Sequence, residues 1–249
     1  AEVTVCERAA VPGGKLRQVQ VDGVPIDAGP TVFTMRWIFE SIFAEAGASL
    51  SSRLRLTPLD VLARHAWDAD TTLDLYADRA RSADAVGRFA GPDEAKRFLA
   101  FCAEARRLYT LLEGPYIRSE RPTLASMAGD LGVKGLAGLV SLGLFPSMWR
   151  ALARHFRDAR LRQLFGRYAT YCGSSPLAAP ATLMLVAQVE MDGVWSVDGG
   201  MHAVAAALAE LARERGAALR YGEHVAEVLV RDGRARGVRL ASGDILDAD

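Results

Sequence analysis

Short alternating runs of apolar and polar residues at both ends of the chain flank a middle part with helical periodicity. Near the start, Val3–Cys6 has the pattern of a strand, and a Pro-Gly-Gly turn follows it. Asp22-Gly23 separates two further alternating runs, as the turn of a β-hairpin does. Residues 34–47 then place apolar side chains at helical spacing, and Gly47 marks the end of that predicted helix.

The middle of the chain differs in its spacing. Residues 61–78 indicate two paired strands, and residues 91–114 form an amphipathic pattern with Pro92 near its start and Gly114 after its end. Residues 147–172 predict a second long helix. We therefore expect this part to be mainly helical, with a small share of strands.

The last part returns to alternating helix and strand signals. Residues 199–217 place a glycine turn before an alanine-rich helix, and two predicted strands, 223–233 and 234–244, meet at the turn Asp232-Gly233. The order predicts an α/β fold: a Rossmann-like nucleotide-binding domain in two segments, 1–60 and 196–249, interrupted by an inserted, mainly helical α+β domain at 61–195. Because the chain begins and ends within strand patterns, we expect a longer parent protein and an incomplete domain.

Composition and charge narrow the possible functions. The chain has 249 residues, 50% of them hydrophobic, and 30 basic residues balance 30 acidic ones. A nucleic-acid-binding surface normally leaves a basic excess, so the balance argues against that class. The three cysteines lie far apart and the four histidines lack ligand spacing. We therefore expect no disulfide framework, no metal site, and a reducing cytoplasmic location.

The most suggestive chemistry is the acid that ends the first predicted strand. In a dinucleotide-binding βαβ unit, an acid at the end of the second strand accepts the hydroxyls of the adenosine ribose. Glu7 has that place, although the glycine-rich phosphate motif, about 20 residues earlier, would precede residue 1. Gly13 and Gly14 would turn the backbone close to the cofactor, and Lys15 would bring a cation to its pyrophosphate. The alternative is an ordinary surface turn after a strand.

Several stretches, taken in order, resemble one enzyme family. Residues 3–16, 27–31 and 193–217, followed by 225–230 and 235–244, resemble the carotenoid desaturases, in the phytoene-desaturase branch of the flavin amine-oxidase-like superfamily. Residues 164–176 and 193–208 are similar to the branch that acts on hydroxyneurosporene or methoxyneurosporene. The resemblance implies FAD as cofactor, a carotenoid as substrate, and desaturation in carotenoid biosynthesis as the activity.

The resemblance also implies roles for individual residues. It assigns Glu7 to the ribose, the glycine turn to a second glycine motif along the cofactor, the Gly-Pro-Thr stretch to the neighbourhood of the flavin ring, and the backbone of Val225 to the adenine. The implied cofactor-binding residues are Glu7, Gly13, Gly14, Lys15, Gly29, Pro30, Thr31 and Val225. Because the first glycine motif is absent, we expect the chain alone to bind FAD poorly and to be inactive.

Other readings remain open beside this one. A phytoene desaturase or another flavin amine-oxidase-like oxidoreductase is the near alternative, and a non-catalytic isoprenoid-binding or lipid-binding protein is the alternative of another class. No residue is assigned a catalytic role: Ser174, Ser175 and His202 fit no nucleophile motif, and Glu190 is equally unassigned. A group of apolar residues fits either a carotenoid channel or plain core packing: Met184, Leu185, Val186 and Trp195.

One stretch suggests contact with a membrane surface. Gly135–Trp149 is an uncharged run of 15 residues, too short to cross a bilayer, which needs about 20. A segment with six arginines and one acid follows it: Arg150, Arg154, Arg157, Arg160, Arg162 and Arg167. We expect peripheral association with the inner membrane from its cytoplasmic side. The alternative is a buried helix with a solvated face. The oligomeric state stays open.

Overall fold

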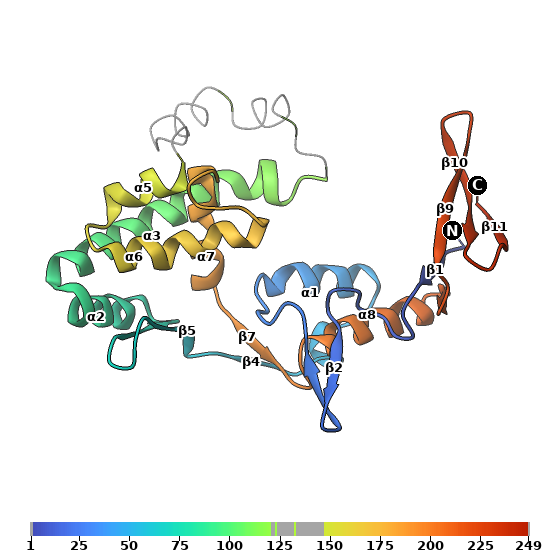
Figure 1. Ribbon diagram of the computed structural model, residues 1–249, viewed down its shortest axis with the longest axis horizontal. Helices are drawn as coiled ribbons and strands as arrows, with labels where there is room; N and C mark the ends of the chain where they lie inside the picture. The colour runs from blue at the N-terminus through green and yellow to red at the C-terminus, as the bar shows by residue number, and fades with distance from the viewer. Residues whose placement is uncertain (1, 121–122, 124–131, 133–146, 249) are drawn as a thin grey trace. The chain divides into compact units, whose positions relative to one another are not determined.

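The computed structural model describes residues 2–120, 123, 132 and 147–248 (Figure 1). Contacts within the chain divide it into two compact units. The first unit consists of Ala1–Thr57 and Trp195–Asp249, and the second of Pro58–Val194. The chain thus leaves the first unit once and returns to it.

The first unit contains most of the strands. Its elements before the second unit are β1 (Thr4–Glu7), β2 (Gln18–Val21), β3 (Val24–Asp27), α1 (Arg36–Glu45), the 3-10 turn η1 (Leu50–Ser52) and β4 (Leu56–Pro58), whose last residue already belongs to the second unit. Those after it are β7 (Trp195–Val197), α8 (His202–Glu214), β8 (Ala218–Tyr221), β9 (Val225–Arg231), β10 (Arg234–Leu240) and β11 (Ile245–Asp247).

A parallel pair of strands brings the two segments of the first unit together. β1 pairs with β8 in parallel, from Thr4 opposite Ala218 to Glu7 opposite Tyr221. Helix α8 directly precedes β8, as the helix of a nucleotide-binding βαβ unit precedes its strand. Within the described residues β1 has no other strand partner, and Val5 on it is 46% exposed. The Rossmann-like sheet is therefore incomplete in this chain.

Two predicted hairpins are confirmed. β2 and β3 pair in antiparallel fashion around Asp22 and Gly23, whose φ angles of 50° and 79° are both positive. β9 and β10 pair around Asp232 and Gly233, with φ angles of 52° and 73°. Two consecutive residues with positive φ match the right-handed twist of the flanking strands, which is why Asp-Gly closes both turns.

The core of the first unit joins its helices to its strands. Phe43 of α1 and Val204 of α8 are fully buried, and Phe33, 1% exposed, makes an antiparallel bridge to Trp195. The remaining members of the cluster come from the same elements and their connections: Leu50, Leu54, Val197, Met201, Ala207 and Leu211. α1 ends as the sequence predicts, with Gly47 in the left-handed conformation at φ 68°.

The second unit is mainly helical. Its strands β5 (Val61–Ala66) and β6 (Thr72–Tyr76) pair in antiparallel fashion, as the sequence predicts for 61–78. Its helical elements are α2 (Arg79–Ala90), α3 (Pro92–Leu112), η2 (Glu113–Ile117), α5 (Met148–His155), α6 (Ala159–Gly166), η3 (Arg167–Cys172), η4 (Ala181–Leu185) and α7 (Val186–Met191). Its core is aromatic: the rings of Phe101, Phe156 and Phe165 have centroids 4.6–5.2 Å apart.

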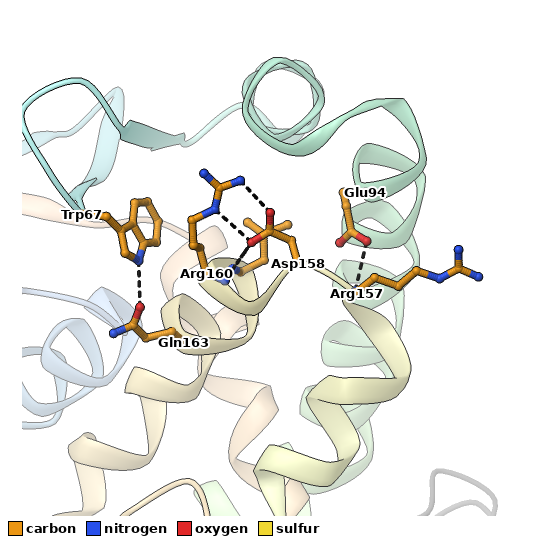
Figure 2. Close-up of polar contacts among 7 residues, drawn as sticks. Trp67, Glu94, Arg157, Asp158, Arg160 and Gln163 are labelled. Atoms are coloured by element: carbon orange, nitrogen blue, oxygen red, sulfur yellow. Dashed lines mark hydrogen bonds and ion pairs between the residues drawn. The ribbon is translucent and has the colours of Figure 1, made fainter.

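The expectation of one long helix over 147–172 is wrong. Phe156 is extended, and α6 begins after Asp158, whose carboxylate accepts a hydrogen bond of 2.7 Å from the Arg160 N–H (Figure 2). Glu94 of α3 accepts a hydrogen bond of 3.0 Å from the Arg157 N–H. The two carboxylates satisfy donors that a continuous helix would have used, so they stabilise the break.

Within residues 2–120 and 147–248, no helix combines the length and the apolar character that crossing a bilayer requires. The apolar run Gly135–Trp149 lies almost wholly outside the described residues; Met148 and Trp149 open α5.

Candidate functional site

Glu7 stands at the carboxyl end of β1, next to the loop that follows β8. Its Oε1 accepts a hydrogen bond of 2.7 Å from the Ala9 N–H, which fixes the direction of the carboxylate. Its backbone oxygen accepts one of 3.0 Å from the Glu223 N–H, two residues before Val225. Glu7 ends β1 and Val225 begins β9, so this hydrogen bond holds two of the predicted cofactor residues in the same region.

A second group of predicted residues meets at the glycine turn. Gly13 and Gly14 both have positive φ, 124° and 55°, which favours glycine at these positions. Gly29 passes so close to the carbonyl oxygen of Lys15 that a Cβ on it would overlap that atom. The Gly29–Thr31 stretch, exposed throughout, therefore lies directly against the turn at Gly13–Lys15.

Asp27 and His202 fasten this turn to the start of α8. The Asp27 carboxylate accepts hydrogen bonds from the N–H groups of Met201 (2.5 Å) and His202 (3.4 Å). The His202 Nε2 lies 3.0 Å from the Pro12 carbonyl oxygen. Sequence reasoning assigned no role to Asp27. The signal for it was an acid that ends a strand and is separated by one alanine from a Gly-Pro pair.

The residues present fit the ribose and pyrophosphate part of a dinucleotide. Glu7 Oε2 has no hydrogen-bond partner within the part of the chain that the structure describes, so it can accept from a diol. Gly14 has open space where a side chain would project, and Lys15 is exposed beside it. Together they offer one anionic acceptor, one close backbone approach and one cation.

The apolar residues considered as channel lining are packed in cores. Met184 is fully buried, and Leu185 and Val186 are 8% and 9% exposed, all within the second unit. Trp195 packs edge-on against Phe33 in the first unit, with centroids 6.5 Å apart. These four residues support their own domains, which is the plainer of the two interpretations of their pattern.

A buried carboxylate with three donors lies in the second unit. Glu190, 5% exposed, accepts hydrogen bonds from Arg167 Nη2 (2.7 Å), Tyr168 OH (2.9 Å) and Tyr171 OH (2.7 Å). Burial raises the pKa of the Tyr171 hydroxyl to about 12, and burial followed by the Glu190 charge raises that of Tyr168. Both phenols therefore stay protonated and donate. The signal missed in the sequence was Arg-Tyr-x-x-Tyr at helical spacing.

A parallel strand pair whose first strand ends in an acid, with a glycine turn fastened to the helix that precedes the second strand, defines the class as a dinucleotide-binding α/β fold. Comparison with family models gives the same answer more specifically. The model described as flavin containing amine oxidoreductase matches residues 1–249. The chain belongs to this family of flavin-dependent oxidoreductases, and the cofactor indicated for it is FAD.

Individual relatives agree with this assignment. The chain is 64% identical over 249 residues to hydroxyneurosporene desaturase of Rubrivivax gelatinosus, covering 100% of this chain and 47% of that protein. It is 46% identical over 251 residues to hydroxyneurosporene desaturase of Cereibacter sphaeroides, covering 100% of this chain and 50% of that protein. The chain therefore spans about half the length of these relatives.

The fold also matches solved structures. A putrescine oxidase triple mutant, redesigned in its cofactor binding, superposes with a TM-score of 0.61 at 16% identity, covering 98% of this chain and 50% of that one. At this identity the likeness concerns the fold alone. It is that of a flavin amine-oxidase-like protein, in agreement with the α/β fold and inserted helical part that the sequence predicts.

Proposed function

We propose that this chain forms the FAD-binding and substrate-binding part of a carotenoid desaturase acting on hydroxyneurosporene or its methoxy derivative. The observation that carries the proposal is the 64% identity, without a gap in coverage of this chain, to a hydroxyneurosporene desaturase. The glycine turn and the acid at the end of β1 support it, because they supply groups that FAD needs.

In the proposed desaturation, the cofactor accepts the electrons. Desaturation removes two hydrogens from adjacent carbons and leaves a double bond, and bound flavin supplies the electron acceptor that side chains lack. The protein's part is to bind and orient. Glu7 accepts hydrogen bonds from the ribose hydroxyls, Lys15 lies by the pyrophosphate, and Gly29, Pro30 and Thr31 pass near the flavin ring. The backbone of Val225 contacts the adenine.

The decisive test uses a hybrid enzyme, in which residues 1–249 replace the matching segment of the Rubrivivax gelatinosus desaturase. The hybrid should purify with bound FAD and desaturate hydroxyneurosporene, as followed by the visible spectrum of the lengthened polyene. Desaturation of phytoene alone would move the assignment to the phytoene desaturases. A hybrid that binds polyene but takes up no FAD on reconstitution would favour a non-catalytic isoprenoid-binding protein.

The proposed substrate is dissolved in lipid, so the proposal includes peripheral contact with the inner membrane from the cytoplasmic side. The arginine-rich segment supports it only in part. Arg167 is turned inward to Glu190, and Arg160 pairs with Asp158 at 2.7 Å (Figure 2). Arg150, Arg154 and Arg157 are exposed.

An exposed apolar side chain lies close to these exposed arginines. The Trp149 N–H donates to the Pro176 carbonyl at 2.9 Å, which places the loop bearing Leu177, 66% exposed, beside the start of α5. Exposed apolar and basic side chains together suit an interface with anionic headgroups.

A flotation experiment tests this contact. The hybrid should bind vesicles containing phosphatidylglycerol more strongly than vesicles of phosphatidylcholine alone. Replacing Arg150 and Arg154 by Gln should weaken binding by roughly 30-fold, from about 1 kcal/mol for each arginine near an anionic surface. The matched control replaces two exposed arginines of the first unit, Arg231 and Arg234, by Gln. Equal loss in both pairs would contradict a contact through α5.

A further inference from the structure

A small pocket lies within the second unit, between the β5–β6 hairpin and the helices α2, α3, α6, η3 and α7. Its volume is about 20 Å³, enough for one oxygen atom with its hydrogen. Leu62, Tyr76 and Met191 are partly exposed at its rim, whereas Tyr168 and Glu190 are buried in its wall. The other buried residues of the lining are mostly apolar, namely Leu75, Phe98, Phe165 and Ala187, so Tyr168 and Glu190 form a polar wall in a largely apolar space.

The polar wall offers an acceptor that is already charged and oriented. Arg167, Tyr168 and Tyr171 donate three hydrogen bonds to Glu190, two of them to Oε2 and one to Oε1. A carboxylate accepts about four hydrogen bonds, so Oε1 keeps capacity for another donor. The Tyr168 oxygen, which donates to Glu190, can also accept.

The same wall offers a donor. Arg79, the first residue of α2, lines the space, and its Nε is buried with no hydrogen-bond partner among residues 2–120 and 147–248. A buried guanidinium N–H that lacks a partner destabilises the fold, so an oxygen atom that accepts from it would be bound favourably. Arg79 requires an acceptor and Glu190 can take a further donor. A hydroxyl group supplies both on one small oxygen atom.

We propose that this cavity is the subsite for the terminal hydroxyl group of a hydroxylated polyene, which accepts a hydrogen bond from Arg79 Nε and donates one to Glu190. The inference rests on the proposed function, since it names how that substrate is selected. The alkyl groups beside the hydroxyl would contact Leu62, Tyr76 and Met191 at the rim. A polyene without the hydroxyl would leave Arg79 unpaired, and so would bind more weakly.

The test measures equilibrium binding in the hybrid enzyme, without turnover. Titration with hydroxyneurosporene and with neurosporene, followed by quenching of tryptophan fluorescence, gives the ratio of the two dissociation constants. The unmodified hybrid should prefer the hydroxylated polyene by about 10- to 100-fold, as expected for a hydrogen bond to charged groups. No preference would overturn the inference.

Two variants examine the two partners separately. Glu190→Gln keeps the size of the side chain, and Arg79→Met removes the donor while keeping an apolar stem of similar length. Each should bring the ratio close to one while the affinity for neurosporene stays the same. The control, Arg88→Met, changes an exposed arginine of the same helix and should keep the full preference. A preference retained in both Glu190→Gln and Arg79→Met would mean that the cavity holds water only.

The experiments can reject the hydroxyl subsite without rejecting the proposed desaturase function, and the reverse. A hybrid that desaturates hydroxyneurosporene and neurosporene equally well would reject the hydroxyl subsite and keep the desaturase. A hybrid that binds hydroxyneurosporene preferentially through Arg79 and Glu190 but takes up no FAD would keep the subsite and reject the enzyme.

Discussion

The Asp27 carboxylate accepts a hydrogen bond of 2.5 Å from the backbone N–H of Met201, which lies 174 residues further along the chain. Met201 immediately precedes helix α8, and its own side chain caps nothing. Asp27 therefore caps the start of α8 by accepting backbone N–H groups, as an N-cap side chain does, although it belongs to a distant segment of the first unit. Its negative charge also lies at the positive end of the helix.

Replacing Asp27 by Ala should destabilise the first unit. Loss of the capping bonds is expected to lower the free energy of unfolding by about 1–3 kcal/mol, with a lower urea midpoint for the hybrid enzyme. FAD content should fall too, because α8 is tied to the glycine turn through His202 and Pro12. Asp198→Ala, which removes an exposed carboxylate near the same helix, is the control and should leave both quantities unchanged.

Glu7→Gln separates the structural role of the side chain, its hydrogen bond to Ala9, from its proposed role in binding the ribose. The amide oxygen can still accept from the Ala9 N–H, so the strand end should keep its shape. The proposed bonds to the ribose hydroxyls would lose their charge, and each such charged bond is worth about 1.5–3 kcal/mol. We expect less flavin per protein after gel filtration, with an unchanged melting temperature of the apoprotein. Flavin content equal to that of the control Glu45→Gln would argue against the ribose role.

Gly29→Ala tests the close approach between the Gly29–Thr31 stretch and the glycine turn at Gly13–Lys15. The added Cβ would overlap the Lys15 carbonyl oxygen, and backbone atoms cannot move aside cheaply. Overpacking of this kind typically costs about 1–3 kcal/mol. The melting temperature of the hybrid and its flavin content should both fall. Gly114→Ala, where nothing lies within 4 Å of the added carbon, should change neither.

Local signals in the sequence predicted local structure well. Asp22-Gly23 and Asp232-Gly233 closed the expected hairpins because their backbone requirement is met by those two residues alone. Pro92 opened α3 for a similar reason, since its ring fixes the φ of a first helical turn. The family itself was visible because several such motifs follow in one order along the whole chain.

Contacts between distant residues were beyond the sequence patterns. The break before α6 depends on Asp158 but also on Glu94, which belongs to another helix. Helical spacing continues across the break, so periodicity alone predicted one helix. The Glu190 cluster likewise joins η3 to α7, and the cap by Asp27 joins the end of β3 to the start of α8. Only the folded chain shows that Glu190, which the sequence left without a role, is buried with three hydrogen-bond donors.

His65 predicts how stability depends on pH. Burial, followed by the nearby positive charge of Arg167, lowers its pKa below the ordinary 6.5, while Glu190 and Asp74 act weakly in the opposite direction. The unfolded chain therefore binds a proton before the folded one does, and stability should decline as the pH falls below about 6.5. His65→Gln should flatten this decline in urea midpoints measured between pH 7 and 5, whereas exposed His224→Gln should not. An acid loss as steep in His65→Gln as in the unmodified hybrid would assign the effect to other groups.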